Sequence, residues 1–255
     1  MADLNNSREL GDSSVLKKTF TILNVFDINH SRLSLSEIAR RSNLPVSTTH
    51  RLLAELVSWN ALKKNEDGNF EIGARLWAMG LLAPLNLELR QASVGPMKEL
   101  LAIGCENAHL AVLDDTLALM VERVSAPNAI NILSRPGSRL PLHATAVGKI
   151  LLTHADRDTQ NKALEKMEKF TANTIIQPAK MRAQMESIRK DGFAITVEEI
   201  RLGSISIAAP VFSPPGKLIA TVGIVFRSTR KDYNKYIPQV MAASRLISQG
   251  MTRYN

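Results

Sequence analysis

The chain has 255 residues, a length that suits two domains better than one. With 45% apolar and 22% charged residues it is not a disordered chain, and its formal net charge of +8 favours a polyanionic partner. A single cysteine excludes an intramolecular disulfide and a zinc site built from cysteines. Residues 1–12 lack the pattern of a secretory signal, and no apolar run reaches the roughly eighteen residues of a membrane span. We therefore expect a cytoplasmic protein with no membrane partner and a flexible tail over residues 1–12.

The positive charge is spread unevenly along the chain. Residues 1–76 hold ten Lys or Arg and nine Asp or Glu, a net +1, which leaves +7 of the total +8 to the rest of the chain. Within residues 32–64, however, six basic residues accompany only two acidic ones. This local excess predicts a surface that meets phosphate groups.

The first elements are typical of a helix-turn-helix. Apolar residues at helical spacing predict a helix over residues 13–28. Ser34 and Glu37 have the spacing of a capping box, so a second helix is expected over residues 35–41. Pro45 disfavours helical geometry at the residue before it and suits the first turn of a third helix.

The third helix has two different faces. One face suits a protein core and carries Thr49, Leu52, Leu53, Leu56 and Val57. The opposite face carries small, polar and basic side chains: Ser47, His50, Arg51, Ala54 and Ser58. Residues 61–64 and 69–72 then read as two strands, joined by a turn in which Gly68 can adopt a positive φ. Together these elements predict a winged helix-turn-helix DNA-binding domain over residues 13–74.

A linker helix is expected over residues 75–90. Residues 73–89 are apolar nearly all round, and Pro84 is expected to kink or break the helix. A helix of this composition must be buried, and because it lies between two domains its partner could be a second chain. The segment therefore favours a homo-oligomer.

Residues 91–255 predict an α+β domain. Strands are expected on either side of a turn at Asp114 and Asp115, and residues 129–133 are a candidate third strand. Helical patterns follow at residues 146–154, 158–170 and 178–192, then strands at 192–199, 204–212 and 218–226, and a last helix at 230–250. Strands, then helices, then strands are typical of a largely antiparallel sheet flanked by helices.

Four blocks of sequence resemble the IclR family of transcription regulators. LSLSEIARRSNLPVSTTHRLLAELVSWNALKK and FEIGARLWAMG resemble its helix-turn-helix region, and RLPLHATAVGKILL and residues 188–224 resemble its C-terminal domain. Asn60 stands where the family usually carries Gly, and Phe70 where Tyr is frequent. The resemblance implies a GAF-like effector-binding and oligomerisation domain over residues 91–255. It also implies homodimers or homotetramers on operator DNA, acting most often as repressors and in some members as activators.

The third helix supplies the first candidates for DNA contacts, because an α-helix fits the major groove and its first turns reach base edges. These candidates are Ser47, Thr48, His50 and Arg51. Candidates for phosphate contacts are Arg40, Arg41, Lys63 and Lys64. Two alternatives stay open: Thr48 could instead cap its own helix, and some of the basic residues could be ordinary solvated charges.

Residues 142–149 are the candidate start of an effector site. Small residues at a helix start leave backbone N–H groups accessible, and these groups and the helix dipole can bind a carboxylate. The resemblance implies effector contacts at Ala146, Val147, Ser206, Gly223 and Val225. Gly223 and Val225 offer no side-chain hydrogen bonds, so we expect an apolar or aromatic organic acid. Glu199 matches a family position and is either a ligand contact or a carboxylate that supports the fold.

Two other classes of function compete with a regulator. An enzyme that carries a DNA-binding appendage has little support, because no nucleophile elbow, HExxH or dinucleotide fingerprint occurs. A structural nucleoid protein would bind DNA without sequence preference. His143 has no companions at metal-ligand spacing, so we expect a structural role for it. We expect no catalytic activity, no cofactor and no metal.

Overall fold

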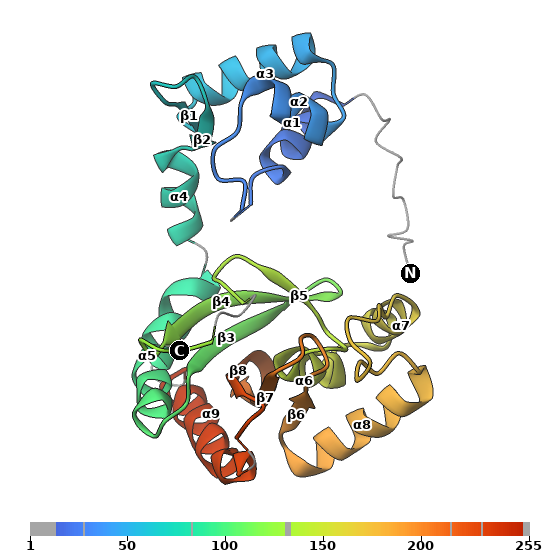
Figure 1. Ribbon diagram of the computed structural model, residues 1–255. Coiled ribbons are helices and arrows are strands. Elements are labelled where there is room, and N and C mark those ends of the chain that lie inside the picture. Colours follow the sequence, from blue (N-terminus) through green and yellow to red (C-terminus); the bar gives the residue numbers. More distant parts are fainter. Residues whose placement is uncertain are drawn as a thin grey trace, which may run out of the picture. The chain divides into compact units, whose positions relative to one another are not determined.

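The computed structural model describes residues 14–27, 29–82, 84–130, 134–214, 216–230 and 232–251. The chain divides into two compact units, Met1–Ala83 and Pro84–Asn255 (Figure 1). The expected tail over residues 1–12 lies outside the described residues. Within the described ranges, no helix combines the length and the hydropathy that crossing a bilayer requires.

The N-terminal unit is a helix-turn-helix followed by a two-stranded wing. Its elements are α1 (Val15–Asn24), α2 (Leu35–Ser42), α3 (Val46–Ser58), β1 (Leu62–Lys64) and β2 (Phe70–Ile72). The two strands pair antiparallel, with Lys63 opposite Glu71. Apolar side chains from all five elements and the loop before α2 form the core, including Ile22, Leu33, Ile38, Leu52, Leu53, Leu56, Leu62 and Phe70. The winged helix-turn-helix architecture expected from the sequence is confirmed.

The first helix is shorter than expected. It ends at Asn24, whereas the apolar pattern predicted a helix as far as Ile28, a residue outside the described ones. The carboxylate of Asp27 accepts hydrogen bonds from the backbone N–H groups of Asn29, at 2.7 Å, and His30, at 3.0 Å. These bonds stabilise a turn in place of further helix.

Two helices stand where one linker helix was expected over residues 75–90. They are α4 (Ala74–Leu81) and α5 (Pro84–Ala102), so the break falls at the proline that predicted it. Helix α5 continues well past residue 90 into the C-terminal unit, where Leu89, Met97 and Leu100 are buried. Helix α4, by contrast, buries no side chain within the chain, and Trp77 is 66% exposed.

An antiparallel sheet forms the centre of the C-terminal unit. Its strands are β3 (Asn107–Asp114), β4 (Leu117–Ser125), β5 (Arg139–Pro141), β6 (Ala194–Val197), β7 (Ser204–Ser213) and β8 (Lys217–Arg227). They lie in the order β5-β4-β3-β8-β7-β6. In the middle of the sheet His109 pairs with both Arg123 and Gly223.

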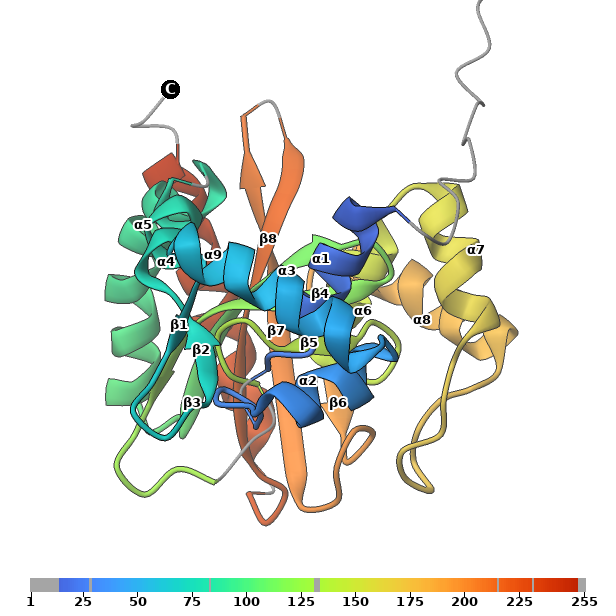
Figure 2. The same ribbon diagram turned by 90° about the horizontal axis from the view of Figure 1, so that it is seen from above.

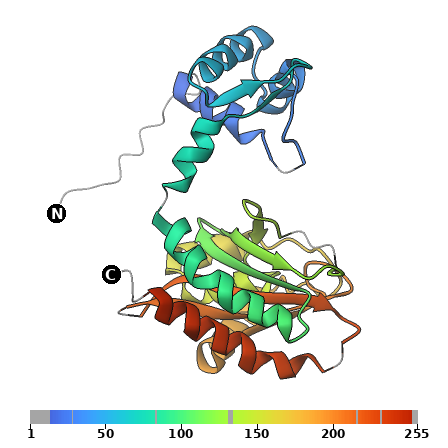
Figure 3. The same ribbon diagram turned by 90° about the vertical axis from the view of Figure 1, so that its left-hand side faces the viewer.

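Helices cover both faces of this sheet (Figure 2). One face is covered by α5 and α9 (Ile237–Met251), which lie side by side (Figure 3). The other face is covered by α6 (Ala146–His154), and α7 (Arg157–Glu165) and α8 (Pro178–Asp191) pack against α6. Because side chains alternate along a strand, Ile207 and Ala209 pack in the α5/α9 core while Ala208 packs in the α6/α8 core. This α+β arrangement matches the expected fold class.

Three expected elements of this unit differ from the structure. Ala129 and Ile130 form no strand, and residues 131–133 lie outside the described ones, whereas β5 was not expected. Helix α7 ends at Glu165 instead of residue 170, because the residues after it form hydrogen bonds with other parts of the unit. The Glu168 carbonyl contacts His143, and the Thr171 hydroxyl donates to the Glu198 carbonyl. The last helix begins at Ile237 after a 3-10 turn, η1 (Tyr233–Tyr236), since Pro238 is tolerated only in a first turn.

Candidate DNA-binding face and small-molecule pocket

Helix α3 presents its polar face to solvent. Thr49, Leu52, Leu53 and Leu56 are buried, so the apolar face lies in the core as expected. Ser47, His50 and Arg51 are exposed, and Thr48 is half-buried. No side-chain cap accompanies the start of α3, so Thr48 does not serve as one. The side chains expected to meet DNA are therefore accessible in this chain.

Local sequence fixes the position of α3. The capping box of α2 is present: the Ser34 hydroxyl accepts from the Glu37 N–H at 3.4 Å, and the Glu37 carboxylate accepts from the Ser34 N–H at 2.9 Å. Asn43 ends α2 in the left-handed conformation with φ of +52°, which Asn tolerates better than most residues. Pro45 then precedes the first residue of α3. The turn between the two helices is thus determined by a few residues in sequence.

The four basic residues expected at phosphates are exposed. Arg40 and Arg41 lie in the last turn of α2, and Lys63 and Lys64 lie on β1 of the wing. Gly68 adopts φ of +81° in the wing turn, as the sequence predicted. Asn60, which replaces the family's usual Gly, has φ of +54° and so does adopt the helix-ending geometry.

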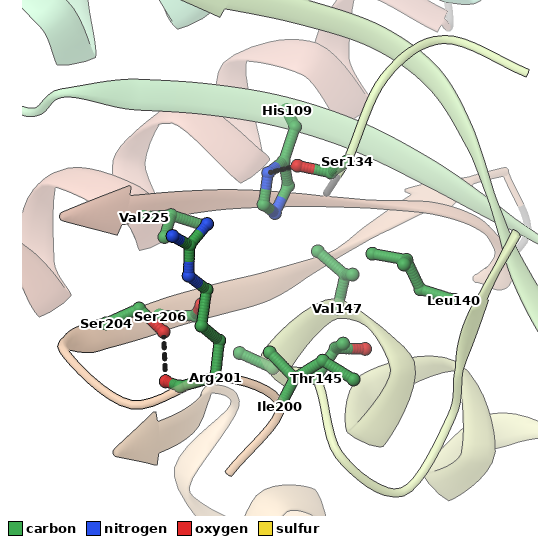
Figure 4. Close-up of a pocket in the computed structure, with 11 residues that line it drawn as sticks. His109, Ser134, Leu140, Thr145, Val147, Ile200, Arg201, Ser204, Ser206 and Val225 are labelled. Atoms are coloured by element: carbon green, nitrogen blue, oxygen red, sulfur yellow. Dashed lines mark hydrogen bonds between the residues drawn. The ribbon is translucent and has the colours of Figure 1, made fainter. Parts of the chain in front are cut away.

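The C-terminal unit contains a narrow pocket of about 40 Å³ between the sheet, the start of α6 and the loop after β6 (Figure 4). Four of the five expected effector residues line it: Ala146, Val147, Ser206 and Val225. The fifth, Gly223, lies beneath them, since a Cβ placed there would approach Val147 Cγ1 to 2.9 Å. Residues from β7, β8 and α6 are therefore brought together at one place.

Helix α6 directs its N-terminus at this pocket. Its N-cap is Thr145, whose hydroxyl accepts from the Gly148 N–H at 3.1 Å. The N–H groups of the first residues in a helix have no partner within the helix, which leaves those of Ala146 and Val147 available to an anion. The geometry suits a carboxylate.

Comparison with known sequences decides the family. The profile of the bacterial transcriptional regulator IclR C-terminal domain matches residues 83–249, and that of the IclR helix-turn-helix domain matches residues 15–66. The chain belongs to the IclR family. Members of this family are DNA-binding transcription regulators, and so is this protein.

Its relatives include regulators with named roles. The HTH-type transcriptional regulator KdgR of Dickeya chrysanthemi is 30% identical over 98% of this chain and 83% of its own. The transcriptional repressor AllR of Escherichia coli K12 is 24% identical over 89% of this chain and 85% of its own. An IclR homologue of Microbacterium hydrocarbonoxydans, solved in complex with 4-hydroxybenzoate, has a TM-score of 0.89 and 28% identity over 94% of this chain and 100% of its own.

Several pocket residues of this IclR-family chain were not among the expected contacts. His109 from β3, Ser134 from the β4–β5 loop and Arg201 from the β6–β7 loop all line the cavity. Burial, with a contribution from nearby Arg123, lowers the pKa of His109 to about 4. A histidine within the apolar run AHLAVL was the signal in the sequence that pointed to it.

A buried ion pair lies next to the pocket. Lys149 Nζ on α6 donates to Glu199 Oε1 at 2.5 Å and to Gln184 Oε1 at 2.8 Å. Burial lowers the pKa of Lys149 and raises the pKa of Glu199. Because Glu199 immediately precedes Ile200 and Arg201 of the pocket wall, the pair fixes that loop to α6, and the carboxylate supports the fold.

Two other reactive side chains have structural surroundings. His143 Nε2 lies 2.8 Å from the Glu168 carbonyl and its ring stacks on Phe170. Burial lowers the pKa of His143 and raises the pKa of Cys105 to about 12, so the thiol stays protonated. Among the described residues, no cluster of His, Cys, Asp and Glu could hold a metal ion.

Proposed function

We propose that this regulator is a repressor whose binding to operator DNA is controlled by a small organic acid. The named repressor among its relatives supports the sign of regulation. Activation is the alternative within the family. The names of the matched relatives describe regulators and give no catalytic activity, which supports a protein that is not an enzyme.

One observation carries the DNA-binding part of this proposal: the exposed polar face of α3. Ser47, Thr48, His50 and Arg51 would meet base edges and adjacent phosphates in the major groove. Arg40, Arg41, Lys63 and Lys64 would contact the phosphates alone. In this proposal residues 13–74 bind DNA and the C-terminal unit senses the effector.

The pocket supports an apolar or aromatic monocarboxylic acid as effector. Its carboxylate would lie at the N-terminus of α6, with Ala146 and Val147 beside it and Ser206, Gly223 and Val225 around the rest of the molecule. The Microbacterium relative binds an acid of this kind, 4-hydroxybenzoate. A volume of about 40 Å³ holds only a few water molecules, so binding would require the pocket walls to move apart.

Exposed apolar side chains support assembly as a homodimer or homotetramer. Trp77 and Met79 on α4 are 66% and 60% exposed, and Leu16 and Phe20 on α1 are 63% and 56% exposed. Large apolar side chains left exposed on these two helices favour a protein–protein interface. A second copy of this chain is the occupant that we propose for it.

The test is operator binding measured with and without acids. A duplex selected from genomic fragments would be labelled and titrated with full-length protein at fixed salt, with a random duplex as competitor. We expect the selected duplex to bind at least about 10³-fold more tightly than the random one. Equal affinities would instead indicate a structural nucleoid protein.

A thermal-shift screen of organic acids would identify the effector. An acid at a hundred times its Kd adds about 2.7 kcal/mol of stability. An acid identified in this way should change operator affinity, and deletion of the gene should raise expression of the target operon. Lower expression after deletion would contradict the repressor assignment and favour an activator.

A further inference from the structure

The pocket contains a buried histidine whose role the fold does not explain. His109 lies in the middle of β3 and is only 4% exposed. Its ring points from the strand into the pocket, between Val147 on one side and Val225 and Arg201 on the other (Figure 4). A polar group in this place faces whatever molecule occupies the cavity.

Among the residues that the structure describes, one of the two ring nitrogens has a hydrogen-bond partner. Nδ1 lies 3.4 Å from the Ser134 hydroxyl. Within the described residues, Nε2 has no hydrogen-bond partner, and Figure 4 shows it on the pocket side of the ring. Because His109 lines the cavity, Nε2 is placed to hydrogen-bond to a polar group of a molecule bound there, and such a bond adds affinity.

The ring is neutral at physiological pH, because burial holds the pKa of His109 near 4. A neutral imidazole donates through one nitrogen and accepts through the other. Such a group does not neutralise a carboxylate. It suits a hydroxyl, which can donate or accept and so satisfies Nε2 in either tautomer.

Gly223 provides the space for this arrangement. It is the partner of His109 across the β3–β8 pair, and a Cβ at this position would come within 3.1 Å of His109 Nε2. A larger residue would push the ring away from β8 or cover its free nitrogen. The glycine and the histidine therefore form one feature of the pocket.

We infer that His109 determines effector specificity by hydrogen-bonding, through Nε2, to a hydroxyl group of the effector. The effector class is then a hydroxylated aromatic or apolar monocarboxylic acid. This inference rests on the proposed effector pocket and adds to it the second polar group of the ligand.

The experiment compares two probes that differ by one hydroxyl group, benzoate and 4-hydroxybenzoate. Isothermal titration calorimetry would measure their Kd values on the full chain and on three variants. His109→Phe keeps an aromatic ring and removes both nitrogens, and His109→Gln retains a polar group near Nε2. His154→Phe is the matched control, because His154 is exposed and lies outside the pocket lining.

We expect the wild-type protein and His154→Phe to prefer 4-hydroxybenzoate by about tenfold or more. His109→Phe should bind the two probes equally, and His109→Gln should recover part of the preference. Equal binding of the two probes by the wild-type protein, or an unchanged preference in His109→Phe, would overturn the inference and leave the effector pocket in place. Failure of the wild-type protein to bind these or any other organic acid in the screen would overturn the effector pocket itself.

Discussion

Replacing Lys149 with Met tests how the pocket wall is held. The Lys149 side chain is 1% exposed and that of Glu199 is 7% exposed, so both charges are buried. Glu199 Oε2 has no hydrogen-bond partner among the described residues, which leaves Lys149 as the main compensation for this carboxylate. Methionine fills a similar volume but carries no charge, so the variant leaves a buried carboxylate without its cation.

The expected cost is about 3–5 kcal/mol in the free energy of unfolding, the range for removing one member of a buried ion pair. Replacing both members by apolar residues, in the double variant Lys149→Met with Glu199→Leu, should cost far less than the single substitution. The difference in unfolding free energy between the single and the double variant separates the cost of the buried charge from the cost of lost packing.

The loss should also depend on pH. Burial raises the pKa of Glu199, and removal of Lys149 raises it further, so the folded variant holds a proton at pH values where the unfolded chain has released it. In the unfolded variant Glu199 has the ordinary glutamate pKa of about 4.5, and in the folded variant its pKa is higher. The free energy of unfolding of the variant therefore falls as the pH rises from the first of these values through the second. The deficit relative to the wild-type protein should be smaller at pH 5 than at pH 8.

Urea unfolding followed by circular dichroism measures this deficit. The two tryptophans, Trp59 and Trp77, both lie in the N-terminal unit, so their fluorescence provides an internal control that Lys149→Met should leave unchanged. A single variant within about 1 kcal/mol of the wild-type protein, or a double variant as unstable as the single one, would refute the assigned role of the pair.

Two further substitutions test the local geometry. Gly148→Ala should destabilise the C-terminal unit by about 1–3 kcal/mol and weaken effector binding, because the new Cβ would lie 2.5 Å from the Leu142 carbonyl oxygen. Gly95→Ala is the matched control, since a Cβ at that position would meet no atom within 4 Å. Equal melting temperatures for the two variants would argue against the close contact at Gly148. Ser34→Ala should cost the N-terminal unit about 1 kcal/mol by removing the α2 cap, and an unchanged urea midpoint of tryptophan fluorescence would contradict the capping interaction.

The N-terminal unit could be predicted from sequence because its decisive signals are local. The capping box at Ser34 and Glu37, the turn before Pro45 and the wing turn at Gly68 each act within a few residues, and each is present in the structure. The end of α7 could not be predicted in this way. It depends on the hydrogen bonds that the Glu168 carbonyl accepts from His143 and that the Thr171 hydroxyl donates to Glu198, because His143 and Glu198 are distant in sequence.

The pocket was predicted only in part, for the same physical reason. The small residues within 142–149 indicated a helix start that could bind a carboxylate, and the resemblance to the family supplied Ala146, Val147, Ser206, Gly223 and Val225. His109 and Ser134 meet because sheet pairing and a loop bring residues 25 positions apart together. Such a contact has no signature within a local stretch of sequence.

The central claim is that the exposed face of α3 reads DNA sequence. The most direct measurement is the affinity of Arg51→Ala for the selected operator and for a random duplex at one salt concentration, beside Lys63→Ala. If Arg51 contacts a base, its loss should cost about 1–3 kcal/mol of operator binding and reduce the preference over random DNA, whereas Lys63→Ala should weaken both duplexes alike. Unchanged operator affinity and preference in Arg51→Ala would contradict the assignment of this face to the major groove.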